Sequence, residues 1–173
     1  MARTHAAFLR GVMPTNCKMP ELAKAFEAAG FTDVLTVLGS GNVVFSTRVK
    51  DLDAITKKAD AAMTKALGRT FTPYVRTLDH LESLVKRDPY ARFHVPAEAK
   101  RDVTFLPRSA ARPTIPAAIP SAAILAIEGD EAFSFHVPRH PDGPRFMKMF
   151  LDTFGEGCTT RTWETVQKVL AKR

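Results

Sequence analysis

A chain of 173 residues that is 45% hydrophobic and 25% charged has the composition of a globular protein, which excludes an intrinsically disordered chain. Cys17 and Cys158 are too few for a disulfide framework, and no apolar run has the length of a signal peptide or a membrane span, so we expect a cytoplasmic protein with no membrane partner. The net charge of +7 favours anionic partners, but the basic residues are scattered along the chain.

The first ninety residues follow a β-α-β-β-α-β pattern. Apolar runs predict strands over residues 6–12, 34–38, 43–45 and 72–78. Helices are predicted from Pro20 to Gly30 and from Asp51 to Gly68, with a short third helix opened by Asp79 and Glu82. This order predicts a ferredoxin-like antiparallel sheet with the spatial order 4-1-3-2 and helices on one face.

The rest of the chain is less regular. Strands are predicted over residues 101–106, 122–128 and 132–137, and helices over 146–154 and from a cap at Thr160 or Thr162 to the C-terminus. A proline-rich excursion over 107–120 and a loop over 136–144 separate them. We find no internal repeat by eye. The fold class is therefore α+β, with a first part over 1–90 and a smaller, closely packed second part over 91–173.

Three groups of residues together resemble one known family. They are Phe8-Leu9-Arg10-Gly11 followed by Met19-Pro20-Glu21-Leu22, the Ser-Gly-Asn-Val-Val-Phe core of residues 38–46, and the Thr-Arg-x-Trp-x-Thr-Val motif of 159–166. In this order they resemble the DUF1697 family, mainly bacterial proteins of about this length whose function is not established. The resemblance implies an α+β fold with a ferredoxin-like first part, and it supplies no reaction.

The chain departs from the family pattern at three places. The family typically has a Gly-Gly loop after Arg-Gly, whereas residues 12–16 here read Val-Met-Pro-Thr-Asn. Gly39 stands where the family often has Gln, and Thr162 stands where it has Asn. If the family's loop cradles an anion, this chain has lost that backbone freedom or binds differently.

Two strand ends and one helix start are predicted to meet at one edge of the first sheet. The first strand ends at Arg10-Gly11 and the second at the turn of residues 39–42, and the two strands run parallel with the third between them. A guanidinium, an accessible glycine-bracketed backbone and a helix N-terminus are components of an anion site. We therefore predict that a small anionic or phosphate-bearing ligand is bound by Arg10, Gly11, Ser40, Gly41 and Asn42.

Several alternatives stay open at this edge. Glu21 would compete for the same helix end, which weakens the anion site. In the alternative without a ligand, Arg10 caps backbone carbonyls and Asn42 supplies the turn geometry. An enzyme could use the same cleft, although Gly39-Ser40-Gly41 lacks the spacing of a nucleophile elbow and no general base is evident. The third hypothesis is a non-specific nucleic-acid binder; the third strand lacks the aromatic residues of an RNA recognition motif, so sequence-specific RNA binding is not expected.

Two further groups of residues have a composition that suggests a site or a motif. His136 and His140, with Asp142 and Cys158 downstream, resemble a metal cluster in composition, but Pro138 prevents a helical pair and predicts exposed loop histidines. We expect no metal and no cofactor. Arg161, Trp163 and Thr165 are predicted to form a structural motif that braces the C-terminal helix, because Trp163 has helical spacing with Val166 and Leu170.

Overall fold

The computed structural model of the chain describes residues 3–108 and 112–173. They form two units, one of Met1–Leu84 with Gln167–Arg173 and the other of Val85–Val166. This differs from the expected division at the C-terminus, where the last residues group with the first unit. The reason is local hydrogen bonding: Arg3 donates to the carbonyl of Lys172 at 2.8 Å, and Arg173 binds Glu82 at 3.1 Å and also Asp79.

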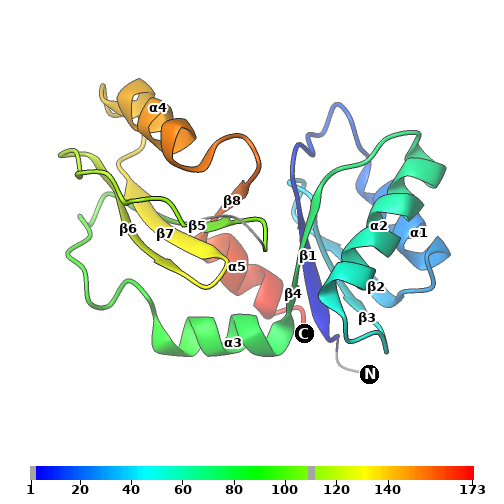
Figure 1. Cartoon of the computed structure of the whole chain (residues 1–173). Helices are drawn as coiled ribbons and strands as arrows, with labels where there is room; N and C mark the ends of the chain where they lie inside the picture. Colours follow the sequence, from blue (N-terminus) through cyan, green and yellow to red (C-terminus); the bar gives the residue numbers. More distant parts are fainter. Residues whose placement is uncertain (1–2, 109–111) are drawn as a thin grey trace. The chain divides into compact units, whose positions relative to one another are not determined.

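The first unit contains one four-stranded antiparallel sheet with the order β2-β3-β1-β4. Its strands are β1 (His5–Leu9), β2 (Thr32–Val37), β3 (Asn42–Ser46) and β4 (Pro73–Thr77). The helices are α1 (Met19–Ala28), α2 (Leu52–Leu67) and α3 (Leu78–Arg87), of which α3 continues into the second unit. The predicted strand order 4-1-3-2 is confirmed, and Figure 1 shows α1 and α2 on one face of this sheet.

Local signals account for most element ends in the first unit. Asp51 caps α2 by accepting from the backbone N–H of Asp53 at 3.0 Å, and Gly68 ends that helix in the left-handed conformation, as predicted. The predicted capping box at Asp79 is wrong. Thr77 caps α3 instead, since its hydroxyl accepts from the N–H of His80 at 3.1 Å, so the helix follows β4 without a loop.

Aromatic side chains fill the core between the first sheet and its two helices. Phe45 of β3 is fully buried and lies with ring centroids 5.5 Å from Phe26 of α1 and 4.6 Å from Phe31. Ile55 and Met63 of α2 are also fully buried in this core. The face of the sheet under α1 and α2 is thus closed by apolar packing.

The second unit has a sheet of the same kind. Its strands are β5 (Lys100–Phe105), β6 (Ala122–Glu128), β7 (Glu131–His136) and β8 (Thr159–Thr162), all antiparallel in the order β6-β7-β5-β8. Helix α4 (Gly143–Phe154) joins β7 to β8, and α5 (Trp163–Leu170) follows β8 directly. Strand β8 was not predicted, because four residues with three threonines show no apolar alternation.

The two sheets have the same topology, which corrects the expectation that the chain has no internal repeat. In chain order, β5, β6, β7, α4, β8 and α5 correspond to β1, β2, β3, α2, β4 and α3. The register agrees as well: His5 pairs with Phe45 and Thr77, and Asp102 pairs with Ser134 and Thr162. Thr162 caps α5 as Thr77 caps α3, by accepting from the N–H of Thr165 at 3.2 Å.

The repeats differ at one element. In the first unit, α1 lies between the first two strands of the sheet. Between β5 and β6 the described residues, 106–108 and 112–121, form no helix. In the described part of the second unit, α4 covers the face that α1 and α2 share in the first, with no second helix beside it, and this leaves room for a cavity.

Candidate functional site

The predicted anion-site residues do lie near one another in the first unit. The N–H of Leu9 donates to the carbonyl of Gly41 at 2.8 Å, and the N–H of Arg10 donates to the carbonyl of Thr72 at 3.0 Å. These bonds bring the end of β1, the β2–β3 turn and the start of β4 to the same edge. Arg10, Gly11 and Ser40 are exposed there.

Several polar groups at this edge bind the protein itself. Asn42 is fully buried, and its side-chain amide donates to the carbonyl of Val37 at 2.9 Å and to the hydroxyl of Ser40 at 3.1 Å. The amide of Asn16 donates to the carbonyl of Gly11 at 2.9 Å and so closes the loop that lacks the family's glycine pair. These contacts give Asn42 and Asn16 roles in turn geometry, and binding of an anion at this edge remains a prediction.

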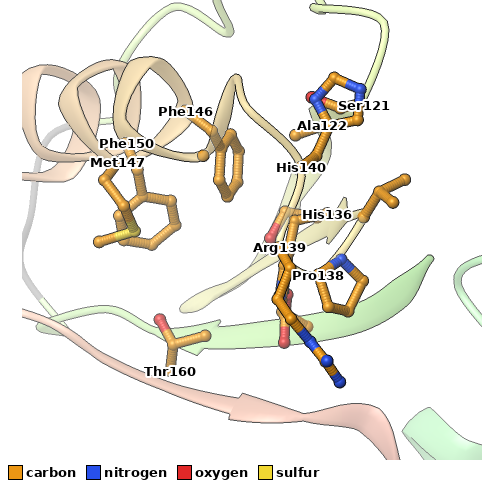
Figure 2. A pocket seen from close by; sticks show the side chains of 14 residues that line it. Ser121, Ala122, His136, Pro138, Arg139, His140, Phe146, Met147, Phe150 and Thr160 are labelled. Carbon is orange, nitrogen blue, oxygen red and sulfur yellow. The ribbon is translucent and has the colours of Figure 1, made fainter.

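A cavity of about 390 Å³ lies within the second unit and is lined by residues from the four strands of its sheet, from α4 and from the β7–α4 loop. Figure 2 shows Phe146, Met147 and Phe150 of α4 along one side, with His136, Pro138 and Arg139 across from them and Thr160 of β8 lying apart. This volume lies within the range of about 300–1,000 Å³ that is usual for small-molecule sites. The cavity is thus large enough to hold an organic ligand.

The polar centre of the cavity is a hydrogen-bonded pair, His136 and Asp102. Nδ1 of His136, the last residue of β7, lies 2.5 Å from Oδ2 of Asp102 on β5. The Asp102 side chain is 8% exposed and that of His136 is 36% exposed. Because Asp102 engages Nδ1, the Nε2 atom of the imidazole is the one left to meet a ligand.

The pair is further characterised by a ring contact of His136 and by the pKa of Asp102. The His136 ring faces that of Phe146, with centroids 6.2 Å apart and an interplanar angle of 17°. Burial raises the pKa of the Asp102 carboxyl above its ordinary value, an effect that His136 and Lys100 offset only in part. Chemically, a histidine oriented in this way binds an anion when protonated and accepts a proton when neutral.

The repeat shows that the floor of the cavity is unusually polar. In the first sheet the covered face carries Ala7, paired with Val43 and Val75. The position of Ala7 is taken in the second sheet by Thr104, which pairs with Ala132 and Thr160. Two residues earlier on the same face, Asp102 and its partner Ser134 stand where the first sheet has His5 and Phe45. The hydroxyls of Thr104 and Thr160 lie 2.9 Å apart. A sheet needing only a core would be expected to use the apolar set of the first unit.

Basic groups outnumber acidic ones around this cavity. His136, Arg139 and His140 line it together with a single acidic residue, Asp102. Oδ2 of Asp142, which does not line it, lies 3.6 Å from Nδ1 of His140. Among the described residues, no group of three or more His, Cys, Asp or Glu side chains is arranged to hold a metal ion. The arrangement favours an anionic organic ligand.

The sequence interpretation missed this site. It assigned His136 both to a strand over 132–137 and to an exposed loop over 136–144, of which the strand is correct because this residue ends β7, and it did not single out Asp102. A signal was available: Asp102 lies within the strand predicted over 101–106, and a carboxylate in a buried strand needs a partner, because an unpaired buried charge is costly. The identity of that partner depended on the pairing of β5 with β7.

The predicted structural motif lies at the junction of β8 and α5. Trp163 is buried and contacts the ring of Tyr90 edge-on at 5.3 Å between centroids, and the hydroxyls of Thr162 and Thr165 lie 2.9 Å apart. Arg161 donates to the hydroxyl of Thr159 and to the carbonyl of Thr160, and burial lowers its pKa to about 10. These contacts are those of a strand end and a helix cap.

We expect Asp102→Asn to leave the protein at least as stable as the wild type at pH 7. Because the folded-state pKa of Asp102 is raised, its contribution to stability is present below the unfolded value of 3.8 and is lost as the pH rises through the folded value. At neutral pH the buried carboxylate therefore costs stability, and Asn can keep the hydrogen bond to His136. Urea unfolding would measure the free energy of unfolding of both proteins at pH 4 and pH 7. The difference between them should favour the variant more at pH 7 than at pH 4, and a variant less stable than the wild type at pH 7 would contradict this.

Comparison with known proteins places the chain in a family. Residues 2–133 match the family described as "Protein of unknown function (DUF1697)". The chain belongs to this family. The matched residues of this DUF1697 protein include Asp102 and the β2–β3 turn, whereas His136, α4 and the Trp163 motif lie beyond them. No curated protein matches the chain.

A solved structure similar to this DUF1697 protein is that of the conserved bacterial protein SP0830 from Streptococcus pneumoniae. The two are 14% identical, the match covers 98% of each chain, and the TM-score is 0.72. At this identity the likeness concerns the fold alone, and it agrees with the α+β class expected from the sequence. No helix in the described part of the chain has the length and apolar character needed to cross a bilayer.

Proposed function

We propose that this DUF1697 protein binds a small organic anion in the cavity of its second unit. The observation that carries the proposal is the His136–Asp102 pair, which lies on a sheet face where Ser134 and Thr160 replace Phe45 and Val75 of the first repeat. A buried carboxylate with a raised pKa costs stability, and such costs are typical of functional sites. The anion would meet Nε2 of His136 and the guanidinium of Arg139.

Benzoate is a suitable probe, with benzyl alcohol as its neutral counterpart of similar size. Titration followed by NMR of the histidine ring signals should show benzoate binding more tightly than benzyl alcohol, with the largest shifts at His136. His136→Gln should weaken benzoate binding at least about tenfold, since it removes a charge-assisted hydrogen bond.

A matched variant controls for the loss of a histidine as such. His94→Gln removes an exposed histidine of the same unit that does not line the cavity, and it should leave benzoate affinity unchanged. Equal benzoate affinity in His136→Gln and His94→Gln would overturn the proposal, as would a preference for benzyl alcohol.

A second candidate is the anion site at the Arg10 edge of the first unit, favoured by the backbone bonds that bring Arg10 and the β2–β3 turn together. Inorganic phosphate is the probe there. If this site binds it, Arg10→Ala should abolish the phosphate-induced rise in melting temperature while leaving the melting temperature of the free protein unchanged. Unaltered phosphate stabilisation in Arg10→Ala would remove this candidate.

The His136–Asp102 pair also favours an enzyme as an alternative at the same cavity, because a carboxylate-oriented histidine is a common general base. Under that reading the bound anion is a substrate, and His136→Gln would abolish turnover while Asp102→Asn would lower it. The binding test with benzoate does not depend on which of the two holds.

A further inference from the structure

Helix α4 presents three different sides, of which one is buried and one is charged and exposed. Phe146 and Phe150 pack on the second sheet in a buried cluster with Ile119 and Ile124. Arg145, Lys148 and Asp152 lie on another side, which borders a shallow hollow formed with Pro113 and Pro116. The third side carries Met147 and Leu151.

That third side is apolar and exposed. Met147 and Leu151, one helical turn apart, are 53% and 46% exposed. Met147 also lines the cavity that holds His136, whereas Leu151 does not, so the exposed strip begins at the cavity and extends one helical turn beyond it. Large apolar side chains exposed next to a binding cavity are typical of a surface that a ligand covers.

We propose that the ligand is an amphipathic carboxylate, whose acid group lies at His136 and whose apolar tail leaves the cavity over Met147 and Leu151. This inference rests on the proposed function and adds the chemical class of the ligand. The acid end meets Nε2 of His136 and Arg139, while the tail first passes Phe146 and Phe150 and then follows the exposed strip. A ligand of this shape uses both the polar floor and the apolar wall of the cavity.

Chain length provides the test. Butyrate and octanoate have the same acid group, and octanoate adds four methylene groups that would lie on Met147 and Leu151. We expect octanoate to bind at least about tenfold more tightly than butyrate, because each buried methylene contributes to affinity. Affinities would be measured below the micelle-forming concentration by isothermal titration calorimetry, with octanol as the probe that lacks the acid.

Variants of the strip identify the place where the tail binds. Leu151→Ser changes an exposed residue that does not line the cavity, and it should lower octanoate affinity about threefold or more while leaving butyrate affinity unchanged. Met147→Ser changes a residue that does line the cavity, and it should lower octanoate affinity more than butyrate affinity. Met13→Ser is the matched control, because Met13 is a 54% exposed methionine in the β1–α1 loop of the first unit. It should change neither affinity.

The outcomes separate this inference from the proposed function. If butyrate and octanoate bind equally and both require His136, the cavity binds anions but the amphipathic class is wrong. If octanoate binds more tightly but Met147→Ser and Leu151→Ser match Met13→Ser, the tail does not follow the strip and the inference fails. If neither acid depends on His136, the proposed function fails as well, and octanol binding as tightly as octanoate would exclude a role for the acid group.

Discussion

Phe45→Ala is expected to lower the free energy of unfolding by about 3–5 kcal/mol, the usual cost of removing a fully buried phenylalanine. Phe45 is 0% exposed and its ring packs against three others, those of His5, Phe26 and Phe31. The sheet on one side of this core and helices α1 and α2 on the other limit how far it can collapse into the space left behind. Urea unfolding followed by circular dichroism would measure the loss.

Phe45→Leu provides the control, because it keeps most of the apolar volume and should cost much less than Phe45→Ala. Similar costs for the two variants would mean that the ring contacts contribute little and that the core is loosely packed. The same position in the second repeat is Ser134, which lines the cavity. At this position a phenylalanine thus fills the core of the first unit, whereas a serine lines the cavity of the second.

Gly41→Ala is expected to cost about 2–4 kcal/mol, the sum of left-handed backbone strain and overpacking. Gly41 has φ of 74°, and a Cβ atom there would lie 2.6 Å from Cγ2 and 2.7 Å from Cβ of Val12. Those distances are shorter than a carbon–carbon contact allows, so the turn or the β1–α1 loop would have to move. Thermal and urea unfolding would both show the loss.

Gly11→Ala is the matched control for this prediction. Gly11 has φ of 82°, but a Cβ atom there would meet nothing within 4 Å, so only the backbone strain of about 1–2 kcal/mol remains. A cost for Gly41→Ala no greater than that for Gly11→Ala would show that the contact with Val12 does not require glycine. Ligand access to the turn backbone would then be the better explanation of Gly41.

The two candidate sites differ in what their polar groups do. At the edge of the first unit, Asn42 and Asn16 are hydrogen-bonded to carbonyls of the turn and loop, so they hold the backbone in place. In the cavity of the second unit, Asp102 holds an imidazole whose other nitrogen is left for a ligand. The two kinds of polar group also differ in their effect on stability. The buried amide of a turn residue such as Asn42 stabilises the fold through its hydrogen bonds, whereas the buried carboxylate of Asp102 lowers stability at neutral pH.

The sequence by itself determined the first sheet and most helix ends, because these depend on local signals. Apolar spacing located α1 and α2, Asp51 and Gly68 marked the ends of α2, and the β-α-β-β-α-β order restricted the sheet to one strand arrangement. The boundaries of β6 were also predicted as they are observed. The helix and strand limits follow from residues inside or next to each element, and the strand order follows from the succession of these elements along the chain.

Only the tertiary structure decided the repeat and the cavity. His136 and Asp102 are 34 residues apart, and their contact follows from the pairing of β5 with β7, which no local pattern specifies. The two repeats share strand order and pairing register but not residue types: Thr104, Ser134 and Thr160 stand where the first repeat has Ala7, Phe45 and Val75. Strand β8 escaped prediction because it is short and polar, and the absence of a helix between β5 and β6 in the described residues became meaningful only beside α1 of the first unit.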